Sequence, residues 1–200
     1  MRLPIEVAAA GAFPLGFTKE DLERKFGLAD ATAVIRNARL RGGVERIGRG
    51  RYRSRALPED VEGYAKAMEE VRERLLGLDP GIPAALDGPT AVWAWTRGGY
   101  VTGTTPSRIV VAVAVPRSKL AEVRKALRGL GADVRSDYPS ANELGVFVKL
   151  NPARRVERTL LSGIPVISRS AVEKLINSNP ALGPAREYLA EPEGPIEVLR

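Results

Sequence analysis

Closely spaced helix start and stop signals in the first quarter of the chain constrain its fold most. An apolar segment over 3–12 predicts a first helix, which Gly11 and Pro14 end. Thr18 and Asp21 have the spacing of a capping box, in which each side chain accepts a hydrogen bond from the other residue's backbone N–H. A second helix is therefore predicted to begin directly after Thr18.

A third helix is predicted directly after the second. Gly27 is placed as the C-cap of the second helix, and Asp30 can N-cap a helix from 31 to about 41. At about 100° per residue, its apolar residues gather on one side of the axis. These are Ala31, Val34, Ile35 and Ala38. The opposite side is polar, with Thr32, Arg36 and Arg39 at its centre and Asn37 and Arg41 at its margins.

A two-stranded hairpin is predicted to follow. Gly42 and Gly43 stop the third helix, 44–47 has the pattern of a strand, 48–50 that of a tight turn, and 51–53 that of the return strand. The order of helix, helix, turn, helix and ribbon predicts a winged helix-turn-helix over 1–57. In such a domain the third helix is the recognition helix and the ribbon is the wing.

The positive charge of the chain is concentrated in this predicted domain. Residues 1–57 carry 12 basic and 6 acidic side chains, so they hold +6 of the net charge of +7. Between Arg36 and Arg55 there are eight arginines and a single acidic residue, Glu45. Clustering of one sign on a short segment is typical of a protein that binds a polyanion. The sequence therefore predicts binding to double-stranded DNA.

Eight basic or polar side chains of the predicted domain have an expected contact. Thr32, Arg36, Asn37 and Arg39 are expected at base edges in the major groove, where arginine pairs with guanine and asparagine with adenine. Arg49 and Arg51, at the wing tip, are expected at the minor groove or adjacent phosphates, and Lys19 and Arg53 at the backbone. The complete predicted DNA-binding set is Lys19, Thr32, Arg36, Asn37, Arg39, Arg41, Arg46, Arg49, Arg51 and Arg53.

Two segments of this domain resemble a known family. The stretches Phe17-Thr18-Lys19-Glu20-Asp21-Leu22 and Arg46-Ile47-Gly48-Arg49-Gly50-Arg51-Tyr52 are similar to the N-terminal winged helix of AbiEi-type antitoxins and related regulators. The resemblance covers about a quarter of the chain. It implies a transcriptional regulator that controls its own operon and has a toxin-like nucleotidyltransferase as protein partner.

The remainder is predicted to be a linker helix over 58–78 and a small mixed α/β domain over 79–200. The linker has an apolar seam with alternating spacings of three and four, which fits either a connector or a homodimer contact. The seam residues are Val61, Tyr64, Met68, Val71, Leu75 and Leu78. In the α/β domain, helices are expected over 84–95, broken at Gly88-Pro89, over 118–128 after Ser118, and up to 176 after Ser168 or Ser170. Strands are expected over 108–115, 132–135, 144–150 and 164–167, with a partly extended tail from Pro180.

Residues 99–105, the strand over 108–115 and residues 162–169 are similar to the second domain of the same antitoxins, which is compared with a nucleotidyltransferase-like fold. Such enzymes need carboxylates on adjacent strands to hold two metal ions. Gly103 and Thr104 could form the turn of such a site, but the strand over 109–115 carries no carboxylate. A fold of this kind is therefore expected to be catalytically empty.

Composition excludes several other classes of function. The chain has no cysteine and no histidine, so it lacks disulfides, thiolate nucleophiles, the commonest general base and the commonest zinc ligands. No cofactor or metal is expected. The longest wholly apolar run, 109–115, is too short to span a membrane, and a cytoplasmic protein is expected. The absence of glutamine and the many ion-pairing side chains indicate a thermophilic source.

Two alternatives to a DNA-binding regulator remain at this point. The same basic surface could bind RNA, and the second domain could be an enzyme that acts on nucleotides. Trp93 and Trp95 could stack on bases but are expected in the core. Arg154, Arg155 and Arg158 form a second basic cluster on a predicted helix, where they could contact flanking DNA.

Overall fold

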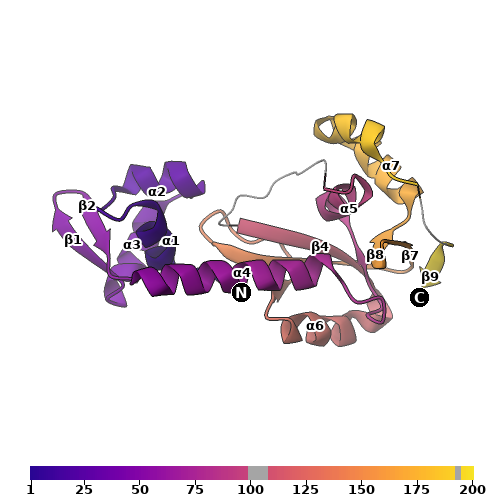
Figure 1. Ribbon diagram of the computed structural model, residues 1–200, viewed down its shortest axis with the longest axis horizontal. Helices are drawn as coiled ribbons and strands as arrows, with labels where there is room; N and C mark the ends of the chain where they lie inside the picture. The colour runs from indigo at the N-terminus through magenta and orange to yellow at the C-terminus, as the bar shows by residue number, and fades with distance from the viewer. Residues whose placement is uncertain (99–107, 192–194) are drawn as a thin grey trace. The chain divides into compact units, whose positions relative to one another are not determined.

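The computed structural model of the chain is mixed α/β and describes residues 1–98, 108–191 and 195–200 (Figure 1). The chain divides into two compact units. The first comprises residues 1–72, 108–109 and 139–146, and the second comprises the remaining described residues. The sequence placed domain boundaries after residues 57 and 78, whereas the first unit extends to residue 72 and includes a segment from much later in the chain.

The first unit begins with three short helices and a hairpin, in the order that the sequence predicts. The elements are α1 (Ile5–Ala12), α2 (Lys19–Phe26), α3 (Ala31–Leu40), β1 (Val44–Gly48) and β2 (Arg51–Ser54). β1 and β2 pair antiparallel through a turn at which Gly50 has a φ of 69°, a conformation that glycine adopts without strain.

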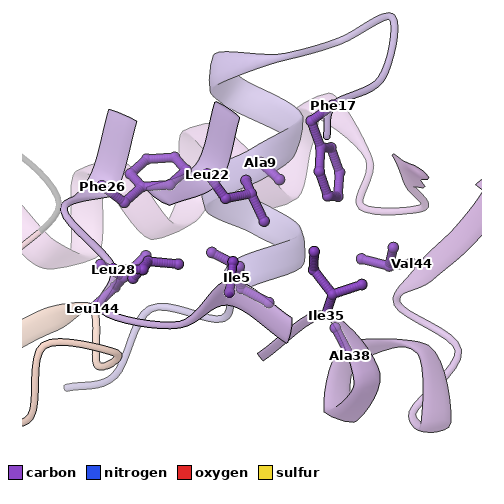
Figure 2. Close-up of a cluster of buried hydrophobic side chains, with 11 residues drawn as sticks. Ile5, Ala9, Phe17, Leu22, Phe26, Leu28, Ile35, Ala38, Val44 and Leu144 are labelled. Atoms are coloured by element: carbon purple, nitrogen blue, oxygen red, sulfur yellow. The ribbon is translucent and has the colours of Figure 1, made fainter. Parts of the chain in front are cut away.

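One apolar core holds these elements together (Figure 2). Leu22 and Phe26 from α2 meet Ile35 and Ala38 from α3, and each of these side chains is at most 4% exposed. Phe17, which is 1% exposed, fills the side next to the hairpin. Spacings of three and four residues along α2 and α3 put these side chains on one face of each helix, so the predicted apolar back of α3 is confirmed.

Residues 139–146 complete this core from a distant part of the sequence. Leu144 is 4% exposed and belongs to the same cluster (Figure 2). The backbone N–H of Leu3 donates to the carbonyl of Leu144 at 2.9 Å, and that of Val146 donates to the carbonyl of Met1 at 2.8 Å. Arg108 donates from its side chain to the carbonyls of residues 141 and 143. The sequence predicted a strand beginning at 144, but it did not predict this partner.

The hairpin is also paired to the segment before α2. Phe17 and Tyr52 exchange two backbone hydrogen bonds, of 2.8 and 2.9 Å. The preceding residue, Gly16, has a φ of 116°, and a Cβ atom there would lie 2.8 Å from the carbonyl oxygen of Tyr52. Only a glycine therefore allows the chain to pass this close to β2.

A long helix, α4 (Pro58–Leu76), follows the hairpin, where the sequence predicts a helix over 58–78. In its apolar seam, Val61 and Tyr64 are half-buried, whereas Met68, Val71, Leu75 and Leu78 are buried within the chain. The connector and homodimer interpretations of the seam both stay predictions.

The second unit contains most of a seven-stranded mixed sheet in the order β5-β6-β4-β3-β8-β7-β9. The strands are β3 (Ala85–Leu86), β4 (Arg108–Pro116), β5 (Asp133–Arg135), β6 (Gly145–Ala153), β7 (Val156–Leu161), β8 (Ile164–Ile167) and β9 (Glu197–Leu199). The predicted strands over 108–115, 132–135, 144–150 and 164–167 are thus present. The β-branched run of β4 is buried near the middle of the sheet, as a strand covered on both faces requires.

Helices cover both faces of this sheet. α5 (Gly88–Trp95) and α7 (Arg169–Ser178) lie on one side, and α6 (Leu120–Gly129) lies on the other (Figure 1). Trp95 on α5 is fully buried and donates from its indole nitrogen to the carbonyl of Ile167 at 3.0 Å, which confirms its expected place in the core. Trp93 is only half-buried.

The expected helix over 84–95 is wrong in its first part. Leu86 pairs with both Val113 and Val166, so residues 85–86 form a strand between β4 and β8. The helix starts only after Asp87, whose side chain accepts the backbone N–H of Gly88 at 2.7 Å. Pairing on both sides outweighs the helical preference of this short alanine-containing segment.

Two further local expectations are corrected. Ser118 does not cap α6, because its hydroxyl donates to the carbonyl of Arg200 at 3.0 Å and a 3₁₀ turn, η1 (Arg117–Lys119), precedes the helix. Ser168 occupies the N-cap position of α7 without a side-chain capping bond, since its hydroxyl lies 3.2 Å from that of Ser170. The tail from Pro180 is partly extended, as expected, because residues 180–188 form 3₁₀ turns, η2 (Pro180–Tyr188), and β9 (Glu197–Leu199) is a strand. Across the described residues, no helix combines the length and the apolar character that crossing a membrane requires.

Candidate nucleic-acid interface

The capping box predicted at the start of α2 is present. The hydroxyl of Thr18 accepts the backbone N–H of Asp21 at 3.2 Å, and the carboxylate of Asp21 accepts the backbone N–H of Thr18 at 2.8 Å. These bonds from Thr18, helped by the nearby charges of Arg24 and Arg51, lower the pKa of Asp21. Gly27 ends the helix with a φ of 62°, as predicted. The start and end of α2 are therefore set locally.

The turn between α2 and α3 is held by side chains at both of its ends. Asp30 caps α3 by accepting the backbone N–H of Thr32 at 2.8 Å, and this bond lowers the pKa of Asp30. The side-chain oxygen of Asn142 accepts two further N–H groups of the turn, from Ala29 at 2.9 Å and from Asp30 at 3.1 Å. The position of α3 therefore depends on the segment 139–146 as well as on its own cap.

Three of the predicted residues on α3 share one exposed side. Thr32, Arg36 and Arg39 are exposed, whereas Ala31 and Ile35 are buried on the opposite side. Successive exposed positions at intervals of three and four residues lie above one another along a helix. These three side chains therefore form a single stripe on α3, called here the α3 stripe.

The other two predicted residues on α3 lie apart from this stripe. Asn37 is five residues beyond Thr32, roughly 140° around the helix axis. Asn37 and Arg41 both line a pocket together with the N-terminal residues and residues 142–144. Arg41 also pairs with Glu6 at 3.2 Å. The structure thus places Asn37 and Arg41 beside α1 rather than beside Arg36 and Arg39.

The hairpin divides its side chains between two faces. Tyr52 and Ser54 lie on the same face of β2. The hydroxyl of Ser54 donates to the carbonyl of Glu6 at 2.6 Å, so this face of β2 contacts α1. Arg51 and Arg53 alternate with these residues and are exposed on the other face.

Two other predicted residues are held by neighbouring groups. Arg46 is the cross-strand partner of Tyr52, so its side chain points to the same face of the hairpin as Tyr52 and away from Arg51. Its Nε donates to the carbonyl of Gly48 at 3.0 Å. Lys19 lies 3.4 Å from Glu23 and 3.7 Å from Asp30. Both side chains therefore have partners in the protein itself.

Five arginines differ from the rest of the basic set. They are Arg36, Arg39, Arg49, Arg51 and Arg53. All five are exposed, and among the described residues none of them makes an ion pair or a side-chain hydrogen bond. By contrast, Arg55 on the same hairpin pairs with Glu45 at 3.0 Å. Unpaired guanidinium groups on neighbouring elements repel one another unless an anion lies between them.

The second basic cluster is not the helical surface that the sequence predicted. Arg154 and Arg155 lie at the junction of β6 and β7, and Arg155 pairs with Glu157 at 2.8 Å. Arg158 is on β7 and only 7% exposed. Its guanidinium donates to Glu197 at 2.8 Å and to two backbone carbonyls of residues 82 and 84, so it has a structural role. The strand was missed because arginines interrupt its apolar pattern.

The second unit contains most of β4, the strand considered for a nucleotidyltransferase-like metal site. β4 carries no carboxylate, and no group of three or more acidic side chains in the described ranges is placed to hold a metal ion. Gly103 and Thr104, the residues considered for a catalytic turn, lie outside the described residues, as does the rest of the stretch 99–105 that carries the family resemblance. No protein-family profile, curated protein or solved structure matches the chain.

Proposed function

We propose that the first unit is a winged helix-turn-helix that binds double-stranded DNA and that the protein is a sequence-specific transcriptional regulator. The observation that carries the proposal is the group of five exposed arginines on α3 and the hairpin that make no ion pair or side-chain hydrogen bond with the described residues. Neighbouring basic side chains such as Arg41 and Arg55 have carboxylate partners, so the missing partners are not a general property of this surface. A DNA duplex supplies the regularly spaced anions that such a group needs.

The arrangement of elements supports the same proposal. In winged helix-turn-helix domains, the second helix of the motif enters the major groove and the hairpin lies beside it. α2 and α3 correspond to the motif, and β1 and β2 to the wing. In this proposal the α3 stripe reads base edges, and Arg49, Arg51 and Arg53 contact phosphates or the minor groove. Lys19, Asn37, Arg41 and Arg46 are secondary contacts because each has another role or position in the protein.

The resemblance to AbiEi-type antitoxins extends the proposal to a biological setting. An antitoxin of this kind would repress its own operon and bind a toxin-like nucleotidyltransferase. The first DNA to test is therefore the duplex immediately upstream of the protein's own coding region. RNA binding is the alternative, and an RNA duplex of the same sequence distinguishes it, because A-form RNA does not open its major groove to a helix.

The test is a gel-shift titration with that upstream duplex and with a scrambled duplex of equal length. Arg36→Ala is expected to reduce the ratio between the two affinities, because its contact is with bases. Arg49→Ala is expected to weaken both affinities alike, because its contact is with the backbone. Arg55→Ala is the matched control, with the same charge change at an arginine that already has a partner. Unchanged binding of Arg36→Ala and Arg49→Ala, or equal binding of the RNA duplex, would contradict the proposal.

The salt dependence gives a second measure of the same contacts. Removing two phosphate contacts with Arg51→Ala and Arg53→Ala should reduce the slope of log affinity against log salt by about 1.8. Between about 50 and 200 mM salt, the wild-type protein should then lose roughly twelvefold more affinity than the double variant. A slope that does not change would place both arginines away from the duplex.

A further inference from the structure

A pocket of about 370 Å³ opens beside α3, on the side away from the α3 stripe. All of its lining residues belong to the first unit. Its apolar lining comes from residues 3–5, Val34 and Leu144. A volume near the lower end of the range for ligand sites, about 300–1,000 Å³, suits a small molecule.

The polar lining of the pocket contains two positive and two negative side chains. Arg41 pairs with Glu6 at 3.2 Å, and Arg2 lies 3.6 Å from Glu143. The charges sum to zero, so the pocket does not favour an anion or a cation alone. A molecule that carries both charges at once matches this lining.

Arg41 has donors left for a carboxylate. Both of its hydrogen bonds to Glu6, at 3.2 and 3.4 Å, come from the same terminal nitrogen. A guanidinium has five N–H donors in a planar fork, and two parallel bonds from it fit a carboxylate. The side chain of Arg41 is 57% exposed, so the rest of the fork is accessible.

Glu6 is the matching acceptor. Its side chain is only 17% exposed, yet within the described part of the chain one guanidinium nitrogen is its sole hydrogen-bond donor. A carboxylate has about four lone-pair positions, so it can also accept an ammonium group. A mostly buried carboxylate with few donors gains more from such a partner than an exposed one does.

We propose that this pocket binds a small zwitterion, an α-amino acid with an aliphatic side chain, as the effector of the regulator. Arg41 binds the carboxylate, Glu6 binds the ammonium group, and Val34 and Leu144 contact the side chain. Asn37 belongs to α3, Arg41 is the C-cap residue of α3, and Asn142 holds the turn before it, so an occupant contacts the groups that position α3. The binding of the zwitterion does not depend on the proposed function, whereas the role of the pocket as an effector site rests on it.

The test of the site is a calorimetric titration of the full chain without DNA. The probes are L-leucine, 4-methylpentanoate, which lacks the ammonium group, and 3-methylbutylamine, which lacks the carboxylate. L-leucine is expected to bind saturably at one site, and each analogue at least about tenfold more weakly, because each loses bonds to a charged group. No saturable binding of L-leucine, or equal binding of an analogue, would overturn the proposal.

A variant pair tests the assigned carboxylate contact. Arg41→Ala should weaken L-leucine binding at least about tenfold, whereas Arg55→Ala, which removes an equally exposed and paired arginine outside the pocket, should leave it unchanged. Equal affinity in both variants would overturn the assignment. The analogue series on the wild-type chain remains decisive even where a variant folds poorly.

The effector role is tested by adding L-leucine to the gel-shift titration. Linkage requires that a ligand that changes DNA affinity also binds the DNA complex with an affinity changed by the same factor. If L-leucine binds and leaves the DNA affinity unchanged, the effector role is refuted and the site stands. If L-leucine binds but no DNA binds, the proposed function fails and the site stands. If DNA binds but L-leucine does not, only the pocket proposal fails.

Discussion

Replacing Leu144 by alanine should destabilise the first unit much more than its position in the sequence suggests. Leu144 is 4% exposed and contributes to a core built otherwise from residues 5–44. The change removes three carbon atoms, worth about 2.4 kcal/mol at about 0.8 kcal/mol per buried methylene. Leu144 also lines an open pocket, so water can fill part of the space and the additional cavity cost is small. The expected loss in the free energy of unfolding is about 2–3 kcal/mol.

Hydrogen exchange measures this loss within the first unit. A loss of about 2–3 kcal/mol corresponds to roughly 30- to 160-fold faster exchange of the protected amides of α2 and α3. Leu40→Ala is the control, because Leu40 lies on α3 with 77% exposure and should change stability by less than about 0.5 kcal/mol. Trp93 and Trp95 both lie in the second unit, so their fluorescence reports its unfolding separately. Equal exchange in the two variants would show that residues 139–146 do not complete this core.

Three other changes should have measurable effects. Gly145→Ala should destabilise the chain by more than about 2 kcal/mol in thermal melts, because Gly145 has a φ of 129° and a Cβ atom there would collide with the carbonyl of Met1. Gly129→Ala is the control: a Cβ atom at Gly129 meets open space, so this change should be neutral or stabilising. Asp30→Asn should lower the melting temperature at neutral pH. Because the pKa of Asp30 is lowered from 3.8, the contribution of its charge is present above that value and lost as the pH falls through the lower folded-state pKa, so the gap to wild type should close as the solution is acidified; a constant gap would contradict this contribution of the charge. Arg158→Met should lower the free energy of unfolding by about 1–3 kcal/mol, because two buried carbonyls lose their donor while Glu197, 57% exposed, is rehydrated. Tryptophan fluorescence follows this unfolding, and an unchanged stability would show that those carbonyls find other donors.

The local parts of the first unit could be predicted from the sequence because their causes are local. Thr18 and Asp21 bond to each other's backbone, Gly27 alone supplies the left-handed turn, and Asp30 caps the helix that follows it. The apolar spacing of α3 then determines which face is buried. These interactions span four residues or fewer, so no knowledge of the tertiary structure is needed to expect them.

The long-range parts could not be predicted in the same way. The bonds that Asn142 accepts from the turn before α3 join residues more than 100 positions apart, and nothing in the pattern of 139–143 distinguishes it from an ordinary loop. Leu86 became a strand because strands on both sides pair with it, although its own sequence favoured a helix. Tertiary pairing of this kind outweighs local preference in short segments.

The candidate site was predicted in composition but not in arrangement. Sequence reasoning grouped Arg36, Arg39 and Arg41 as one basic surface because they are close along one helix. The structure separates Arg41 from the others because Glu6, on α1, is its partner. The signal that could have indicated this was the helical wheel itself, on which Arg41 lies about 140° from Arg36.

Leu144 is synthesised long after residues 1–57, and this order affects when the first unit can fold on the ribosome. The ribosome releases residues 1–57 well before residues 139–146, and at about 5–20 residues per second the delay is of the order of 5–20 seconds. During that interval the nascent helices lack both a core leucine and the side chain that holds the turn before α3. A stretch that looks like an independent domain in the sequence must therefore wait for a later part of the chain, so chaperones that act on nascent chains have a defined interval in which to bind it.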